Sequence, residues 1–165
     1  MASPHFCKNN GAAGFAMLEL LIAIAILAAV CGFFAFADGQ SQRFFSFASD
    51  RDAVLAALRY ARAISMNSVC TGGGCTASRP HGVHFDPDKK EAVIFQGNDF
   101  SNRDGDFDEM VAFESRATYI DAAAPIDVVF AALSGNANSQ EVILRDDFGG
   151  RADILINALG RIDWR

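Results

Sequence analysis

The chain has 165 residues, of which 51% are hydrophobic, and a formal net charge of −6. This length allows one domain with a modest core behind an N-terminal apolar segment, and the hydrophobic content excludes a disordered chain. The acidic balance argues against nucleic-acid binding as the main function, because such surfaces rely on Lys and Arg.

The N-terminus combines a short polar stretch, residues 1–14, with the 23-residue apolar run 15–37, "FAMLELLIAIAILAAVCGFFAFA". At 1.5 Å per residue this run is about 34 Å of helix, which is enough to cross a bilayer. A secretory signal is cut after its apolar core, whereas here the small residues 11–14 come before it. By composition alone, a single-pass anchor with an uncut tail is the simplest interpretation.

Three residues at the start of this run change that interpretation. Gly14, Phe15 and Glu19 form a Gly-Phe-x-x-x-Glu pattern before an aliphatic run, which resembles the prepilin leader of type IV pilins and type II secretion pseudopilins. The resemblance implies that a prepilin peptidase cuts between Gly14 and Phe15 and methylates the new N-terminal residue. It also implies that Glu19 pairs within the membrane with the N-terminal amine of a neighbouring subunit. A Glu19 that snorkels to the lipid headgroups is the alternative.

Helical periodicity continues beyond the apolar run. No Pro occurs between Phe15 and Ser68, so the sequence predicts one helix of over 50 residues, with Gly32 and Gly39 as its weakest points. We divide it into a transmembrane half, 15–37, and an amphipathic half, 38–69. The apolar stripe of the second half recurs at helical spacings and consists of Phe44, Phe47, Val54, Leu58, Ala61 and Ile64.

The remainder, residues 70–165, is β-rich. Seven short runs lie between turn-forming stretches, at 82–85, 91–96, 110–114, 126–132, 141–145, 152–157 and 161–164. This spacing favours antiparallel sheet over βαβ units. We therefore expect an α+β protein with a pilin-like fold, in which the amphipathic half of the helix packs on a mainly antiparallel sheet.

Within the pilin-like proteins, the closer resemblance is to the GspH/FimT type. It rests on "LAALRYARAISMNSV" (55–69), "HGVHFDPDKKEAVIFQ" (81–96) and "INALGRI" (156–162). This resemblance implies a structural minor pseudopilin of a type II secretion system that initiates or tips a short pseudopilus. A type IV minor pilin for pilus assembly, adhesion or DNA uptake is the alternative.

The resemblance also implies the partners and the location of the chain. Other pilins or pseudopilins would pack against its long helix, a prepilin peptidase would process it, and an inner-membrane assembly platform would extract it from the lipid. The chain would cross the cytoplasmic (inner) membrane once, with its globular domain extracytoplasmic, and would be filament-associated after assembly.

An acidic loop, "NDFSNRDGDFDE" (98–109), is the most ligand-like stretch of the β-rich part. Its clustered oxygens suit calcium, which takes six to eight oxygen ligands in flexible geometry; the candidate ligands are Asp99, Asn102, Asp104, Asp106, Asp108 and Glu109. The spacing fits an EF-hand loop only in part, and a solvated, charged hairpin loop is the alternative. A membrane-anchored calcium- or ligand-binding module is thus a second class of function.

Cys70 and Cys75 are the two cysteines of the β-rich part. Outside the cytoplasm they are expected to form a small-loop disulfide. Free thiols are one alternative, and a zinc site with His81 and His84 is another. No cofactor beyond a metal ion at these places is expected.

The C-terminal "GRIDWR" bears on nucleic-acid binding. Some FimT-like minor pilins bind DNA through a C-terminal Gly-Arg-x-Arg element. Here Asp163 stands where the second Arg belongs, and Arg165 comes two residues later. A carboxylate at that position repels phosphate, so DNA binding through Arg161 and Arg165 is disfavoured. No nucleophile lies beside the two His of the β-rich part, and we expect no enzymatic activity.

Overall fold

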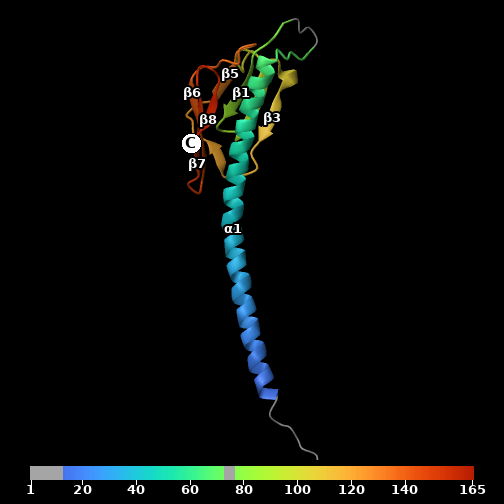
Figure 1. Cartoon of the computed structure of the whole chain (residues 1–165), viewed down its shortest axis with the longest axis vertical. Helices are drawn as coiled ribbons and strands as arrows, with labels where there is room; N and C mark the ends of the chain where they lie inside the picture. The colour runs from blue at the N-terminus through green and yellow to red at the C-terminus, as the bar shows by residue number, and fades with distance from the viewer. Residues whose placement is uncertain (1–12, 73–76) are drawn as a thin grey trace, which may run out of the picture. The chain divides into compact units, whose positions relative to one another are not determined.

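A computed structural model of the chain (Figure 1) describes residues 13–72 and 77–165, with side chains throughout except at residues 13–16 and 35–44. The chain divides into two compact units, residues 1–42 and 43–165. The helix α1 (Ala13–Met66) begins in the first unit and ends in the second. A single helix of over 50 residues is therefore confirmed, and neither Gly32 nor Gly39 interrupts it.

The described part of the first unit is the apolar portion of α1. Its segment Met17–Phe34 has a mean hydropathy of 2.6 and no buried residue, so by length and composition it can cross a membrane. Large apolar side chains such as Leu21, Ile24 and Leu27 are each more than half exposed. A helix that is apolar on every side needs an apolar surrounding, because exposure of its apolar side chains to water is unfavourable in free energy on every face.

The second unit contains two antiparallel four-stranded sheets. The first has the order β3-β2-β1-β5 and the second the order β4-β6-β7-β8. In chain order, the strands are β1 (His81–Asp86), β2 (Glu91–Gln96), β3 (Glu109–Ala112), β4 (Thr118–Ile120), β5 (Ile126–Phe130), β6 (Gln140–Asp146), β7 (Arg151–Ile156) and β8 (Ile162–Trp164). A 3-10 helix, η1 (Gly105–Phe107), precedes β3.

The core of this unit joins the helix to both sheets. Val54, Leu58 and Ala61 of α1 are fully buried. They belong to one apolar cluster with residues of the first sheet, Val83 and Phe85 among them, and of the second sheet, including Val142, Leu144 and Ile154. Each fully buried Val, Leu, Ile or Phe side chain contributes about 1.5–3 kcal/mol through burial. The predicted packing of the amphipathic half on antiparallel sheet is therefore confirmed.

The predicted apolar stripe is mostly buried as expected. Phe47 joins the core cluster with Val54, Leu58 and Ala61, and Ile64 packs against it. The side chain of Phe44 lies outside the described residues. The stripe therefore marks the face of α1 that the sheets cover.

Seven of the eight strands fall on predicted runs, with ends that differ by up to two residues. The exception is β4, which the sequence analysis missed. It has three residues and pairs only with β6, so it is too short for an alternating pattern to be recognised. The α+β class with antiparallel sheets is confirmed.

Candidate functional site

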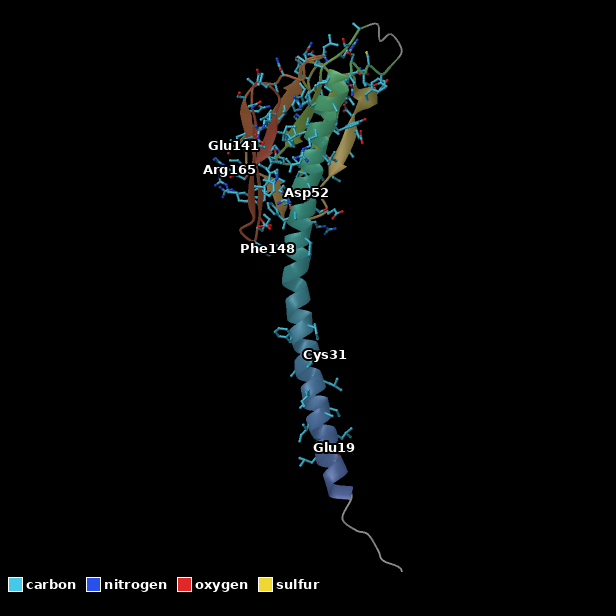
Figure 2. All side chains as sticks on the ribbon, viewed as in Figure 1. Glu19, Cys31, Asp52, Glu141, Phe148 and Arg165 are labelled. Atoms are coloured by element: carbon cyan, nitrogen blue, oxygen red, sulfur yellow. The ribbon has the colours of Figure 1, made fainter. Side chains whose placement is uncertain are left out.

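Glu19 is the one charged side chain of the segment Met17–Phe34. It projects from the N-terminal part of α1 (Figure 2) and is exposed. Among the described residues it has no hydrogen-bond or ion-pair partner. Gly14 and Phe15, which flank the predicted cleavage point, lie in the first turns of α1, and the side chain of Phe15 is outside the described residues. Any partner of the Glu19 carboxylate would therefore come from outside the described residues.

The acidic loop folds onto the outer face of the first sheet. His84 of β1 and Asp127 of β5 are direct partners across the two strands, and His84 Nδ1 lies 2.6 Å from Asp127 Oδ1. The second oxygen, Asp127 Oδ2, accepts the backbone N–H of Phe100 at 3.2 Å. One carboxylate thus fixes both the imidazole ring and the start of the loop.

Phe100 forms the centre of a three-layer stack. The His84 ring lies parallel to it, with centroids 3.6 Å apart and planes 4° apart. The guanidinium carbon of Arg103 also lies 3.6 Å from the Phe100 centroid. Two groups cannot share the space above one face of a ring, so they occupy opposite faces. The loop is therefore held by aromatic stacking on one side and a cation–π contact on the other.

The acidic side chains of the loop do not converge. Arg103 Nε lies 2.7 Å from Asp108 Oδ2, and the carboxylate of Asp99 accepts hydrogen bonds from the backbone and side chain of Asn102. In the described part of the chain, no group of three or more His, Cys, Asp or Glu side chains is placed to hold a metal ion. The loop is thus held both by contacts between its own residues and by His84 and Asp127 of the first sheet.

The segment that follows α1 is attached to β2 through Gln96. The buried amide of Gln96 accepts the backbone N–H of Thr71 at 3.0 Å and donates to the Thr71 carbonyl at 3.1 Å. Cys70, next to it, is disulfide-bonded. Its predicted partner Cys75 lies outside the described residues, so the pairing of these two cysteines stays a prediction.

The alternative zinc site fails on strand geometry. His81 and His84 are three residues apart on β1, so their side chains leave opposite faces of the sheet. His84 is held by Asp127, whereas His81 is buried at the start of β1. The backbone N–H of His81 donates a hydrogen bond to Ser65 Oγ of α1 at 2.9 Å. Burial lowers the pKa of the His81 imidazole below its ordinary value of 6.5.

The C-terminal arginines are paired with carboxylates. Arg161 Nε lies 2.9 Å from Asp163 Oδ2. Arg165 lies near Glu141, at 3.8 Å (Figure 2), and near Asp153, at 3.7 Å. Asp163 thus neutralises the arginine that a Gly-Arg-x-Arg element would present.

Two features of the second unit were missed by sequence reasoning. Asp50 of α1 is buried and accepts the backbone N–H groups of Glu114 and Ser115. Arg59 and Arg62 of α1, which lie off the apolar stripe, line a cavity together with Arg161. Neither has a local sequence signal, because both join α1 to segments more than 60 residues away.

Comparison with known proteins identifies one motif. A family model described as the prokaryotic N-terminal methylation motif matches residues 9–35. No curated protein and no solved structure matches the chain. The matched residues include Gly14, Phe15 and Glu19 and most of the apolar segment. The motif indicates a protein of the type IV pilin or pseudopilin type.

Proposed function

We propose that this chain is a structural minor pseudopilin of the GspH/FimT type, which enters or initiates a short pseudopilus of a type II secretion system. The observation that carries the proposal is the methylation motif at residues 9–35, continuous with an apolar helix in which Glu19 is the single charge. A prepilin peptidase cuts between Gly14 and Phe15, and the methylated amine of Phe15 begins the mature protein.

The chemistry of Glu19 supports assembly through α1. An unpaired carboxylate in a bilayer costs free energy, up to about 2.5–3.5 kcal/mol at the centre on insertion scales, and Glu19 lies about one helical turn from the start of the apolar run. The N-terminal amine of a neighbouring Phe15 removes this cost, because it supplies an opposite charge at the same depth. Glu19 is exposed and unpaired among the described residues, as a contact between subunits requires. The carboxylate then fixes the register of one subunit against the next.

Two observations favour secretion over DNA uptake and over catalysis. The arginines of the C-terminus are paired with Asp163, Asp153 and Glu141, which lowers their availability for phosphate. His84 is held by Asp127, and His81 is buried, so neither is presented as a general base to a substrate. We therefore propose a structural role, with the globular part outside the cytoplasm.

Replacing Glu19 tests the role in assembly. In a host that carries the secretion machine, Glu19→Ala is expected to lower incorporation into sheared filaments by roughly tenfold or more, since the lost pairing is worth over about 2 kcal/mol. Membrane insertion should persist, because the substitution makes the segment more apolar. Leu20→Ala, at the next position, is the matched control. Unchanged incorporation of Glu19→Ala would refute the proposed register role.

The choice of machine is tested by deleting the gene. Loss of protein export with intact surface pili and DNA uptake is the expected result for a secretion pseudopilin. Loss of pili or of DNA uptake with normal export would instead assign the chain to a type IV pilus.

A further inference from the structure

A basic cavity lies between α1 and the C-terminal strand β8. It has a volume of about 350 Å³ and is lined by Arg59, Arg62, Ala63, Met66, Arg161 and Ile162. Three arginine side chains therefore line one concavity in a chain whose net charge is −6. We call this cavity the arginine pocket.

The positive charge of the arginine pocket is only partly compensated. Arg161 is paired with Asp163. Arg59 has no acidic partner among the described residues, and Arg62 donates only to the Leu159 carbonyl, at 3.3 Å. Arg62 Nε is buried with no hydrogen-bond partner. Because a guanidinium carries five donors, Arg59 and Arg62 retain unused capacity for a carboxylate.

Two glycines hold the loops of this region close to α1. A Cβ on Gly135 would lie 2.6 Å from Met66 Cγ, and one on Gly160 would collide with the Gly135 carbonyl oxygen. Both glycines have positive φ, 65° and 69°, which favours glycine. The backbone around the arginine pocket is therefore closely packed against the helix, and this packing limits how far Arg62 can move.

An acidic surface lies on the other flank of the same helix. Asp104, Asp106 and Glu109, at η1 and the start of β3, have no ion-pair partner among the described residues. Glu109 lines a second cavity, of about 220 Å³, together with Tyr60 and Ile64 of α1. We call these three carboxylates the acidic ridge.

The two surfaces cannot meet within one chain. At 100° per residue, the buried stripe of Val54, Leu58 and Ala61 separates the flank of Arg59 and Arg62 from the flank of Tyr60 and Ile64. Figure 1 shows β8 and β3 on opposite sides of α1. Opposite charges on opposite flanks can therefore pair between two copies of the chain, but not within one copy.

We propose that the arginine pocket receives the acidic ridge of a second copy of this chain. Such a contact is heterologous, since different surfaces of the two copies meet, and it leaves a free pocket and a free ridge at the ends. In the pseudopilus such a contact would place two copies side by side with their α1 helices parallel. Charge complementarity fixes the register of this contact more than its affinity. The inference rests on the proposed function for the parallel arrangement of the helices.

Zero-length carbodiimide cross-linking tests the contact in the full chain. The R59K/R62K variant keeps both charges and adds amines that couple to carboxylates. Equal amounts of ¹⁴N- and ¹⁵N-labelled protein are mixed in detergent, so that mass spectrometry distinguishes links between copies from links within one copy. R145K is the positive control, because Arg145 lies 2.7 Å from Asp121 and should give a link within one copy.

The expected result is mixed-isotope links from position 59 or 62 to Asp104, Asp106 or Glu109. Their yield should fall at least fivefold at high salt and in D104N/D106N/E109Q. Mixed links from these positions to other carboxylates only, or the absence of mixed links while R145K reacts, would overturn the proposal. So would a total yield of mixed-isotope links that is unchanged in D104N/D106N/E109Q.

A competition arm addresses nucleic acid. The wild-type chain and R59E/R62E are tested for binding to duplex DNA. If DNA binds the wild type but not the variant, and if it also abolishes the mixed-isotope links, the pocket binds phosphate and the proposal is overturned. The experiment requires no filament, so its failure is distinct from failure of the proposed function. Glu19→Ala tests the latter, and it should leave the cross-links in detergent unchanged.

Discussion

The carboxylate of Asp50, on α1, accepts the backbone N–H of Glu114 at 2.6 Å and that of Ser115 at 3.2 Å. Asp50 is 1% exposed, so these two donors replace the water that an ionised carboxylate would otherwise require. Because residues 113–117 connect β3 of the first sheet to β4 of the second, this contact fastens the link between the sheets to the helix.

Removing this carboxylate should destabilise the second unit. We expect Asp50→Ala to lower the free energy of unfolding by about 1.5–3 kcal/mol, because it leaves buried N–H groups unpaired. Asp52→Ala is the control: Asp52, labelled on α1 in Figure 2, is exposed and among the described residues pairs with its neighbour Arg51 alone, so its loss should cost less than about 1 kcal/mol. Urea unfolding of the full chain in detergent measures both. Equal effects would contradict the anchoring role.

Phe100 should control the order of the acidic loop. Phe100→Ala removes the stack on His84 and the cation–π contact with Arg103, and we expect a loss of about 1–3 kcal/mol. Hydrogen exchange should quicken in residues 98–108 and stay unchanged in β6 and β7. Met110→Ala, at an exposed site on β3, is the control. Unchanged exchange in the loop would show that the stack does not hold it.

The buried imidazole of His81 should make stability depend on pH. Burial lowers its pKa in the folded state below 6.5, so the unfolded chain binds the proton more tightly. Stability should therefore fall as pH drops from about 7.5 through 6.5 towards the lowered pKa. The side chain of Asn102 lowers the pKa of Asp99, and Arg151 lowers that of Asp153, so these carboxylates are ionised throughout this window.

Unfolding measurements at pH 7.5 and 5.5 on the wild type and on His81→Gln test this expectation. The variant should show a smaller decrease in the free energy of unfolding than the wild type, whatever its stability at pH 7.5. An identical decrease in both proteins would contradict it.

Calcium should not stabilise the protein. A calcium site would raise the free energy of unfolding by about 2.7 kcal/mol at a concentration of 100 times its Kd. Asp108 is paired with Arg103 and Asp99 with Asn102, and no three acidic side chains of the described residues converge on one point, whereas calcium takes six to eight oxygens around one position. Thermal melting with millimolar calcium, and with magnesium as the control, should show no shift. A rise specific to calcium would restore the calcium-site hypothesis.

The sequence predicted those parts of the structure that depend on regular patterns. The uninterrupted helix and seven strands follow from periodicity and turn residues. The stack around Phe100 was not predictable, because His84, Phe100 and Asp127 come from separate segments that only the paired strands bring together. The acidic residues 98–109 suggested a metal site because their composition does not reveal which of them are already paired, as Asp108 is with Arg103.

The arginine pocket illustrates the same limit. Arg59 and Arg62 lie off the apolar stripe, which is also true of any solvated face. Their proximity to Arg161 depends on the way the last loop packs against α1, where Gly160 and Gly135 make close contact. The leader, in contrast, was recognised from Gly14, Phe15 and Glu19 alone, because the methylation motif is local in sequence.

The mass of the mature N-terminal peptide tests the central claim most directly. The protein is purified from a host with an active prepilin peptidase, and its N-terminal peptide is sequenced by mass spectrometry. The account predicts a chain that begins at Phe15 and carries one methyl group on its amine, and an uncut chain when Gly14 is replaced by Val. A wild-type chain that keeps residues 1–14 in that host would contradict it.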